Sequence, residues 1–134
     1  MFKLDARLES DTIFIHDLPL CRVLLMNDSQ FPWLILVPRV DGVTEIIELS
    51  DEQQQQFLKE SAQVSRLLQT QFSPDKLNIA ALGNVVSQLH IHHVARYKSD
   101  IAWPKPIWGA QAVVAYPDDK ATELVDALKQ ALSK

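Results

Sequence analysis

Residues 88–96, QLHIHHVAR, hold three of the four histidines of this 134-residue chain. Apolar residues surround these histidines, so the direction of each side chain decides what the imidazoles can do. If the stretch is a β-strand, successive side chains point to opposite faces of the sheet. The side chains expected together on one face are those of Gln88, His90 and His92. His93 is then expected on the opposite, mostly apolar face, where a core or interface role is favoured over a chemical one.

The row of Gln88, His90 and His92 is compatible with three interpretations. The histidines could be ordinary hydrogen-bonded residues of an antiparallel sheet. They could bind zinc or another transition metal, although a third ligand from His16 or a carboxylate has no recognisable spacing. They could also carry phosphate chemistry, in which a neutral imidazole attacks phosphorus and a protonated neighbour stabilises the developing charge. An unperturbed pKa near 6.5 lets modest shifts divide these roles between two neighbouring histidines.

The rest of the chain predicts an α+β domain with a mainly antiparallel sheet. The expected strands are 12–17, 20–26, 33–39, 77–82, 88–96 and 109–116. Turn residues fill 27–32, and 43–49 fits a strand extension, a short strand or a loop. The two prolines within 103–109 exclude regular structure there.

Two helices are expected. Ser50 is the predicted N-cap of a helix that runs to about Thr70, and Gln53 completes an S-x-x-Q capping box. The second helix is expected from Asp118 to about Ser133, with leucines and a valine on its buried side. The length of the chain favours one domain.

Composition sets further bounds. The chain is 47% hydrophobic and 22% charged, which is typical of a soluble globular protein, and its net charge of −4 disfavours broad binding to nucleic acid. Cys21 is the only cysteine, so an internal disulfide is impossible. The charged N-terminal residues do not form a signal peptide, and no apolar run is long enough to span a membrane. A cytoplasmic location is expected.

At QLHIHHVAR the chain resembles the histidine triad (HIT) superfamily, whose signature is His-φ-His-φ-His-φ-φ on a strand, with φ apolar. Arg96, four residues after the last in-phase histidine, sets the register. Gln88 then takes the place of the first histidine, His90 that of the middle one and His92 that of the third.

The segments before this strand follow the same family order. These segments are LLMND, WLILVPR, the helix at 50–70 and LNIAALGN. The resemblance covers about residues 2–110 and leaves about 109–133 as a C-terminal strand and helix extension of a single HIT-like domain, 1–134. It implies a mainly antiparallel five-stranded sheet with a long central helix and an additional C-terminal helix.

The resemblance also implies a function. A HIT-like protein of this kind would be a nucleotide hydrolase or nucleotidyl transferase, acting at the α-phosphate of a dinucleoside polyphosphate or nucleoside phosphoramidate. His90 would be the nucleophile that forms a nucleotidyl-histidine, and His92 would contact the phosphate or the leaving group and assist proton transfer. Asn27 matches a position that contacts ribose, Asn84 one near the phosphates, and Arg96 could hold phosphate oxygens. No cofactor and no metal are expected, and the family implies a homodimer.

Two departures from the family pattern keep other functions open. Gln88 cannot titrate, although it can still form hydrogen bonds in place of a histidine. The loop between LLM and WLILVPR is short, which affects the pocket for the base and ribose. The alternatives are a nucleotide-binding module without turnover and a metalloenzyme that uses His90 and His92 as ligands. The loop that carries Trp103 and Trp108 fits either a dimer interface or core packing.

Overall fold

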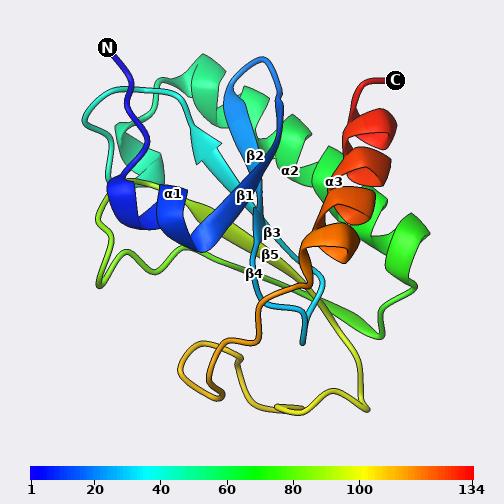
Figure 1. The fold of residues 1–134 in the computed structure, drawn as a ribbon. Helices are drawn as coiled ribbons and strands as arrows, with labels where there is room; N and C mark the ends of the chain where they lie inside the picture. The colour runs from blue at the N-terminus through cyan, green and yellow to red at the C-terminus, as the bar shows by residue number, and fades with distance from the viewer.

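A five-stranded sheet in the order β1-β2-β3-β5-β4 forms the centre of the computed structural model, which describes residues 1–134 (Figure 1). The strands are Thr12–Asp17 (β1), Cys21–Met26 (β2), Trp33–Pro38 (β3), Lys76–Ala80 (β4) and Ile91–Arg96 (β5). Every neighbouring pair is antiparallel, which confirms the expected α+β class and sheet. The histidine strand β5 lies between β3 and β4, so both of its edges are hydrogen-bonded.

The long helix α2, Asp51–Phe72, begins where the sequence predicts. The Ser50 hydroxyl accepts a hydrogen bond from the Gln53 amide at 3.1 Å, and the Gln53 side chain accepts one from the Ser50 amide at 2.9 Å. This capping box satisfies backbone N–H groups that have no partner within the first turn. The helix ends at Phe72, two residues beyond the expected Thr70, because the next residue, Ser73, has a left-handed φ of 47° that cannot continue the helix.

The sheet separates two apolar clusters. The larger one packs the side chains of one sheet face against α2 and the C-terminal helix α3, Asp118–Leu132, which lie along that side (Figure 1). The smaller one covers the opposite face with the short helix α1, Ala6–Asp11, and the segment around Ala102 and Ile107. Alternation along β3 explains the division, because Leu34 and Leu36 belong to the larger cluster and Ile35 to the smaller one.

Two local expectations differ from the structure. The strand expected at 109–116 is absent, because this segment is held by the turn after β2 instead of by a sheet edge. Val114 O accepts from the Ser29 amide at 2.7 Å, and the Tyr116 amide donates to Asn27 Oδ1 at 3.0 Å. The histidine strand begins at Ile91 and not at residue 88. Of the three forms expected for residues 43–49, the structure shows the loop, and this loop contains the 3₁₀ turn Ile46–Glu48.

Helix α1 is not predicted from the sequence. Only Leu8 of its six residues is buried, so the segment has no apolar periodicity. Its signal is Asp5, whose carboxylate accepts a hydrogen bond from the Arg7 amide at 2.8 Å and caps the helix. None of the helices is long and apolar enough to cross a membrane.

Candidate active site

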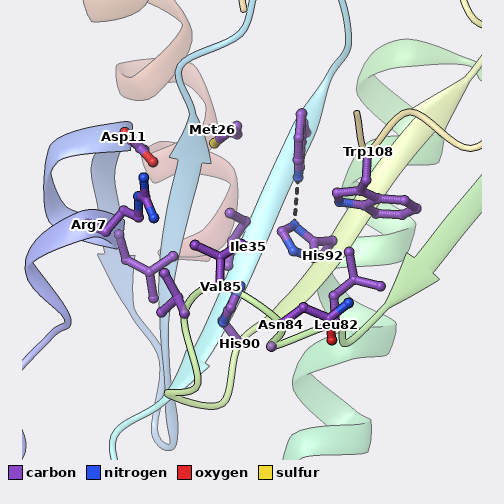
Figure 2. Close-up of a pocket in the computed structure, with 14 residues that line it drawn as sticks. Arg7, Asp11, Met26, Ile35, Leu82, Asn84, Val85, His90, His92 and Trp108 are labelled. Atoms are coloured by element: carbon purple, nitrogen blue, oxygen red, sulfur yellow. Dashed lines mark hydrogen bonds between the residues drawn. The ribbon is translucent and has the colours of Figure 1, made fainter. Parts of the chain in front are cut away.

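A cavity of about 340 Å³ opens on the sheet face opposite α2, between α1, β3, the loop at 82–86 and the start of β5 (Figure 2). His90, His92 and Asn84 line it together with Trp33 and Trp108. The rest of its wall is mostly apolar and includes Leu8, Met26, Ile35, Leu82, Val85 and Val86. An apolar chamber with a few convergent polar groups is the usual form of a small-molecule site.

His90 is the first of the two cavity histidines. Its side chain is 7% exposed, and its Nδ1 lies 2.7 Å from the carbonyl oxygen of Gln88. Because a carbonyl oxygen only accepts, Nδ1 carries the proton and donates. In the neutral ring the lone pair is therefore on Nε2. That nitrogen makes no hydrogen bond within the chain. Trp108 Nε1 is the only buried side-chain nitrogen or oxygen that lacks a partner, so Nε2 of His90 is not buried and is accessible to solvent.

His92 stands beside His90, with 5.0 Å between the ring centroids (Figure 2). Its Nδ1 lies 3.0 Å from the indole nitrogen of Trp33, and the Trp108 ring packs against it at 5.3 Å. Burial and, to a smaller extent, the neighbouring His90 and His93 together lower the pKa of His92 to about 3. His92 is therefore neutral near pH 7, and the protonated neighbour that the sequence argument favoured is disfavoured by this environment.

His93 lies on the opposite face, as alternation predicts. It is fully buried, and its Nε2 lies 2.7 Å from the Ser61 hydroxyl of α2. Its Nδ1 lies 3.1 Å from the Ile91 carbonyl and donates to it, so Nε2 accepts from Ser61. Burial lowers the pKa of His93 to about 4, although the hydrogen bond to Ile91 opposes the shift. This histidine joins the sheet to α2.

Gln88 does not line the cavity with the histidines, so the expected row of three is incomplete. Alternation fails here because residue 88 precedes the first residue of β5. The Gln88 side chain instead holds the N-terminal segment: Oε1 accepts from the Asp5 amide and Nε2 donates to the Lys3 carbonyl, both at 2.8 Å. Its backbone carbonyl is the group that orients His90.

The three residues expected to bind substrate are separated in the structure. Asn84 lines the cavity, but Asn27 does not, and its Oδ1 accepts from the Tyr116 amide. Arg96 is on the histidine face by alternation, yet its guanidinium is buried and lies outside the cavity lining.

Each of the three guanidinium nitrogens of Arg96 already donates a hydrogen bond within the chain. It donates to both Asp100 carboxylate oxygens at 2.8 and 3.1 Å, to Asn78 Oδ1 and to the Lys105 carbonyl. The hydrogen bond from Arg96 holds the Asp100 pKa at about 2. Arg96 therefore anchors the segment that follows β5.

Several cavity residues could not be predicted from the sequence. Arg7, Leu8 and Asp11 come from α1, which had no recognisable pattern, and Figure 2 shows Arg7 and Asp11 on the wall across from His92. Trp33 was assigned only to a buried strand. Its position could have been inferred once β3 and β5 were paired, because it is two residues from Ile35, the partner of His92.

No group of three histidine, cysteine, aspartate or glutamate side chains is placed to hold a metal ion. His90 and His92 each use Nδ1 for a hydrogen bond within the chain. The metalloenzyme alternative therefore lacks a third protein ligand.

Comparisons with known proteins agree on one family. The family model described as HIT domain matches residues 7–99. A histidine triad protein from Marinobacter aquaeolei is 49% identical, with a TM-score of 0.96 over 99% of this chain and 97% of that one. One from Bradyrhizobium japonicum is 46% identical, with a TM-score of 0.94 over 97% of both chains. One from Sinorhizobium meliloti is 39% identical, with a TM-score of 0.94 over 97% and 96%. The curated proteins include no match.

Proposed function

The chain belongs to the HIT domain family, and on that premise we propose that it is a nucleotide hydrolase or nucleotidyl transferase. Its substrate would be a dinucleoside polyphosphate or a nucleoside phosphoramidate, cleaved at the α-phosphate. The observation that supports the proposal most strongly is the tautomer of the His90 ring. Its Nδ1–H donates a hydrogen bond to the Gln88 carbonyl, which fixes the proton on Nδ1 and leaves the Nε2 lone pair free at the cavity.

The reaction would take place in two displacements. In the first, His90 Nε2 attacks the α-phosphorus and a P–N bond forms. The leaving group departs with the electron pair of the broken bond and takes up a proton from solvent. In the second, water attacks phosphorus, the P–N bond breaks, and His90 recovers its lone pair as a proton is released. A transferase would use another hydroxyl in place of water.

The surrounding residues fit such a substrate. His92 and Asn84 can donate hydrogen bonds to phosphate oxygens, and both line the cavity. The apolar wall can accommodate a base and ribose. The volume of the cavity, about 340 Å³, is near the lower end of the range for small-molecule sites, roughly 300–1,000 Å³. Arg7 brings a positive charge to the same cavity.

The test is AMP release from diadenosine polyphosphates and from adenosine phosphoramidate. The variant is His90→Ala, and the control is His16→Ala, which removes a histidine of β1 outside the cavity. Release by the wild type and the control, lost in His90→Ala, supports the proposal. No release from folded wild-type protein contradicts it for these substrates, and nucleotide-dependent thermal stabilisation without release would identify a binding module instead.

We also propose that the protein is a homodimer that pairs through β4. This strand is an edge of the sheet, and edge strands present unpaired backbone groups. Ile79 on β4 is 51% exposed, and Leu82 and Val85 in the following loop are also exposed apolar residues. Light scattering should give the mass of a dimer for the wild type and of a monomer for Ile79→Lys. A monomeric wild type at micromolar concentration would contradict the dimer.

A further inference from the structure

The indole of Trp33 makes the only hydrogen bond of the His92 ring within the chain. The Trp33 Nε1 to His92 Nδ1 distance is 3.0 Å, and both side chains are 6% exposed. An indole nitrogen can only donate, so His92 Nδ1 must accept and cannot carry a proton. The single proton of the neutral ring is therefore on Nε2.

We infer that Trp33 is a positioning residue that holds His92 in the neutral Nε2–H tautomer and so makes it a fixed hydrogen-bond donor in the cavity. The consequence for catalysis rests on the proposed function, whereas the tautomer does not. A histidine held in this way does not exchange protons with the substrate. It offers one N–H of constant direction to a phosphate or leaving-group oxygen.

The two cavity histidines then have opposite tautomers. The Gln88 carbonyl requires a proton on Nδ1 of His90, and the Trp33 indole forbids one on Nδ1 of His92. One ring consequently presents a lone pair on Nε2 and the other an N–H on Nε2. A nucleophile and an adjacent donor are the two groups that phosphoryl displacement needs.

Trp33 is itself held firmly. It begins β3, where it pairs with Val94 of β5, and its ring contacts Trp108 edge to face at 6.4 Å. Ile35, two residues further along β3, pairs with His92, so Trp33 reaches His92 diagonally across the strand pair. Protonation of His92 Nδ1 would set two N–H groups against each other and break the hydrogen bond to Trp33.

The charged and titratable groups around His92 either also favour its neutral form or lie farther away, across the cavity. His90 and His93 on its own segment both disfavour its protonated form. Arg7 and Asp11 of α1 lie across the cavity and carry opposite charges. The neighbouring strand β3 and the loop after β5 present the uncharged rings of Trp33 and Trp108.

The test is long-range ¹H–¹⁵N NMR of the histidine rings in the wild type, Trp33→Phe and Trp108→Phe. The control is closely matched, because Trp108 also packs against the His92 ring but makes no hydrogen bond to it. We expect His92 of the wild type to show a proton on Nε2 alone from pH 5 to 8, with a scalar coupling from the Trp33 N–H to Nδ1. In Trp33→Phe the ring should become a mixture of tautomers, while Trp108→Phe keeps the wild-type pattern.

Activity adds a second readout. For Trp33→Phe we expect kcat for AMP release to fall about tenfold, as for loss of one hydrogen bond, with KM within about twofold of the wild type. A wild-type His92 that is protonated on Nδ1, or an unchanged tautomer in Trp33→Phe, would overturn the inference. Because the wild-type spectrum alone decides the tautomer, a poorly folded variant does not remove the test, and absence of AMP release would count against the proposed function only.

Discussion

His92 and His93 are neighbours in the sequence, and the sheet gives them opposite surroundings. His92 faces the cavity among Trp33, Trp108 and His90, whereas His93 faces α2 and is hydrogen-bonded to Ser61. Both are neutral near pH 7, since burial lowers the pKa of His92 to about 3 and of His93 to about 4.

The difference between them is what each ring leaves unpaired. Both ring nitrogens of His93 are used within the chain, so this histidine contributes to stability and has no group left for a substrate. His92 has one nitrogen bound and one free at the cavity. Burial and a lowered pKa are therefore common to both histidines, and the two differ in the number of ring nitrogens that are hydrogen-bonded within the chain.

The largest expected effect is that of pH on stability, and both histidines contribute to it. Their folded pKa values are below the unfolded value of 6.5, so the stabilisation is complete above pH 6.5 and is lost as pH falls toward about 4 for His93 and about 3 for His92. By pH 4.5 each histidine should have lowered the free energy of unfolding by on the order of 2–3 kcal/mol. Urea unfolding at pH 7.0, 5.5 and 4.5 measures this.

The comparison predicts that His93→Gln has a smaller loss of stability between pH 6.5 and 4.5 than the wild type, because one of the two histidines no longer titrates. Equal slopes for the wild type and His93→Gln would show that His93 is not held neutral. The wild type and His93→Gln have the same carboxylates, so the titration of these groups cancels in the comparison.

His92→Ala should separate catalysis from stability. We expect kcat for AMP release to fall by about 100-fold or more, since a positioned donor next to the nucleophile is lost. The free energy of unfolding should change by only about 1 kcal/mol, because the ring is at a cavity wall. A variant with wild-type kcat would show that His92 is not part of the reaction.

His93→Ala should show the reverse behaviour. Its removal leaves a hole between β5 and α2 and deprives Ser61 of its partner, so we expect a loss of about 2–3 kcal/mol in unfolding free energy. The kcat of the folded fraction should remain within about twofold of the wild type. Ser61→Ala, which removes the hydrogen bond alone, should cost about 1 kcal/mol. A strong loss of kcat in either variant would contradict the structural assignment.

Gln88→Ala should have the smallest effect. The side chain ties the N-terminal segment, and hence α1, to the loop before β5. Its loss should raise KM by about threefold to tenfold while kcat changes little, because each hydrogen bond contributes about 1 kcal/mol. Increased amide exchange at Asp5 would confirm the loosening. A large fall in kcat with an unchanged KM would instead assign Gln88 to the chemical step.

Much of the fold could be predicted because its signals are local. The capping box at Ser50 and Gln53 and the alternation along β5 each depend on a few adjacent residues, and both are confirmed. Alternation placed His92 and His93 on opposite faces correctly. It failed at Gln88 because it holds only within a strand, and the sequence does not mark where β5 begins.

The features that could not be predicted from the sequence depend on contacts between residues that are distant in the chain. The segment 109–116 is apolar enough for a strand, but its partners are Asn27 and Ser29, and no sheet edge is available to it. Arg96 has the composition of a phosphate ligand, yet Asp100 and Asn78 use its donors. Trp33 reaches His92 only through strand pairing, so the residue that sets the tautomer of His92 has no signal in the local sequence.

We propose that His90 is a nucleophile whose tautomer is fixed by the Gln88 carbonyl. The most direct measurement is mass spectrometry of the protein quenched with acid-free denaturant during turnover of adenosine phosphoramidate and diadenosine polyphosphate. We predict an adenylyl adduct on the peptide that contains residues 88–96, located on His90 and absent from His90→Ala. Turnover by wild-type protein that never carries an adduct, or an adduct at another residue, would contradict the account.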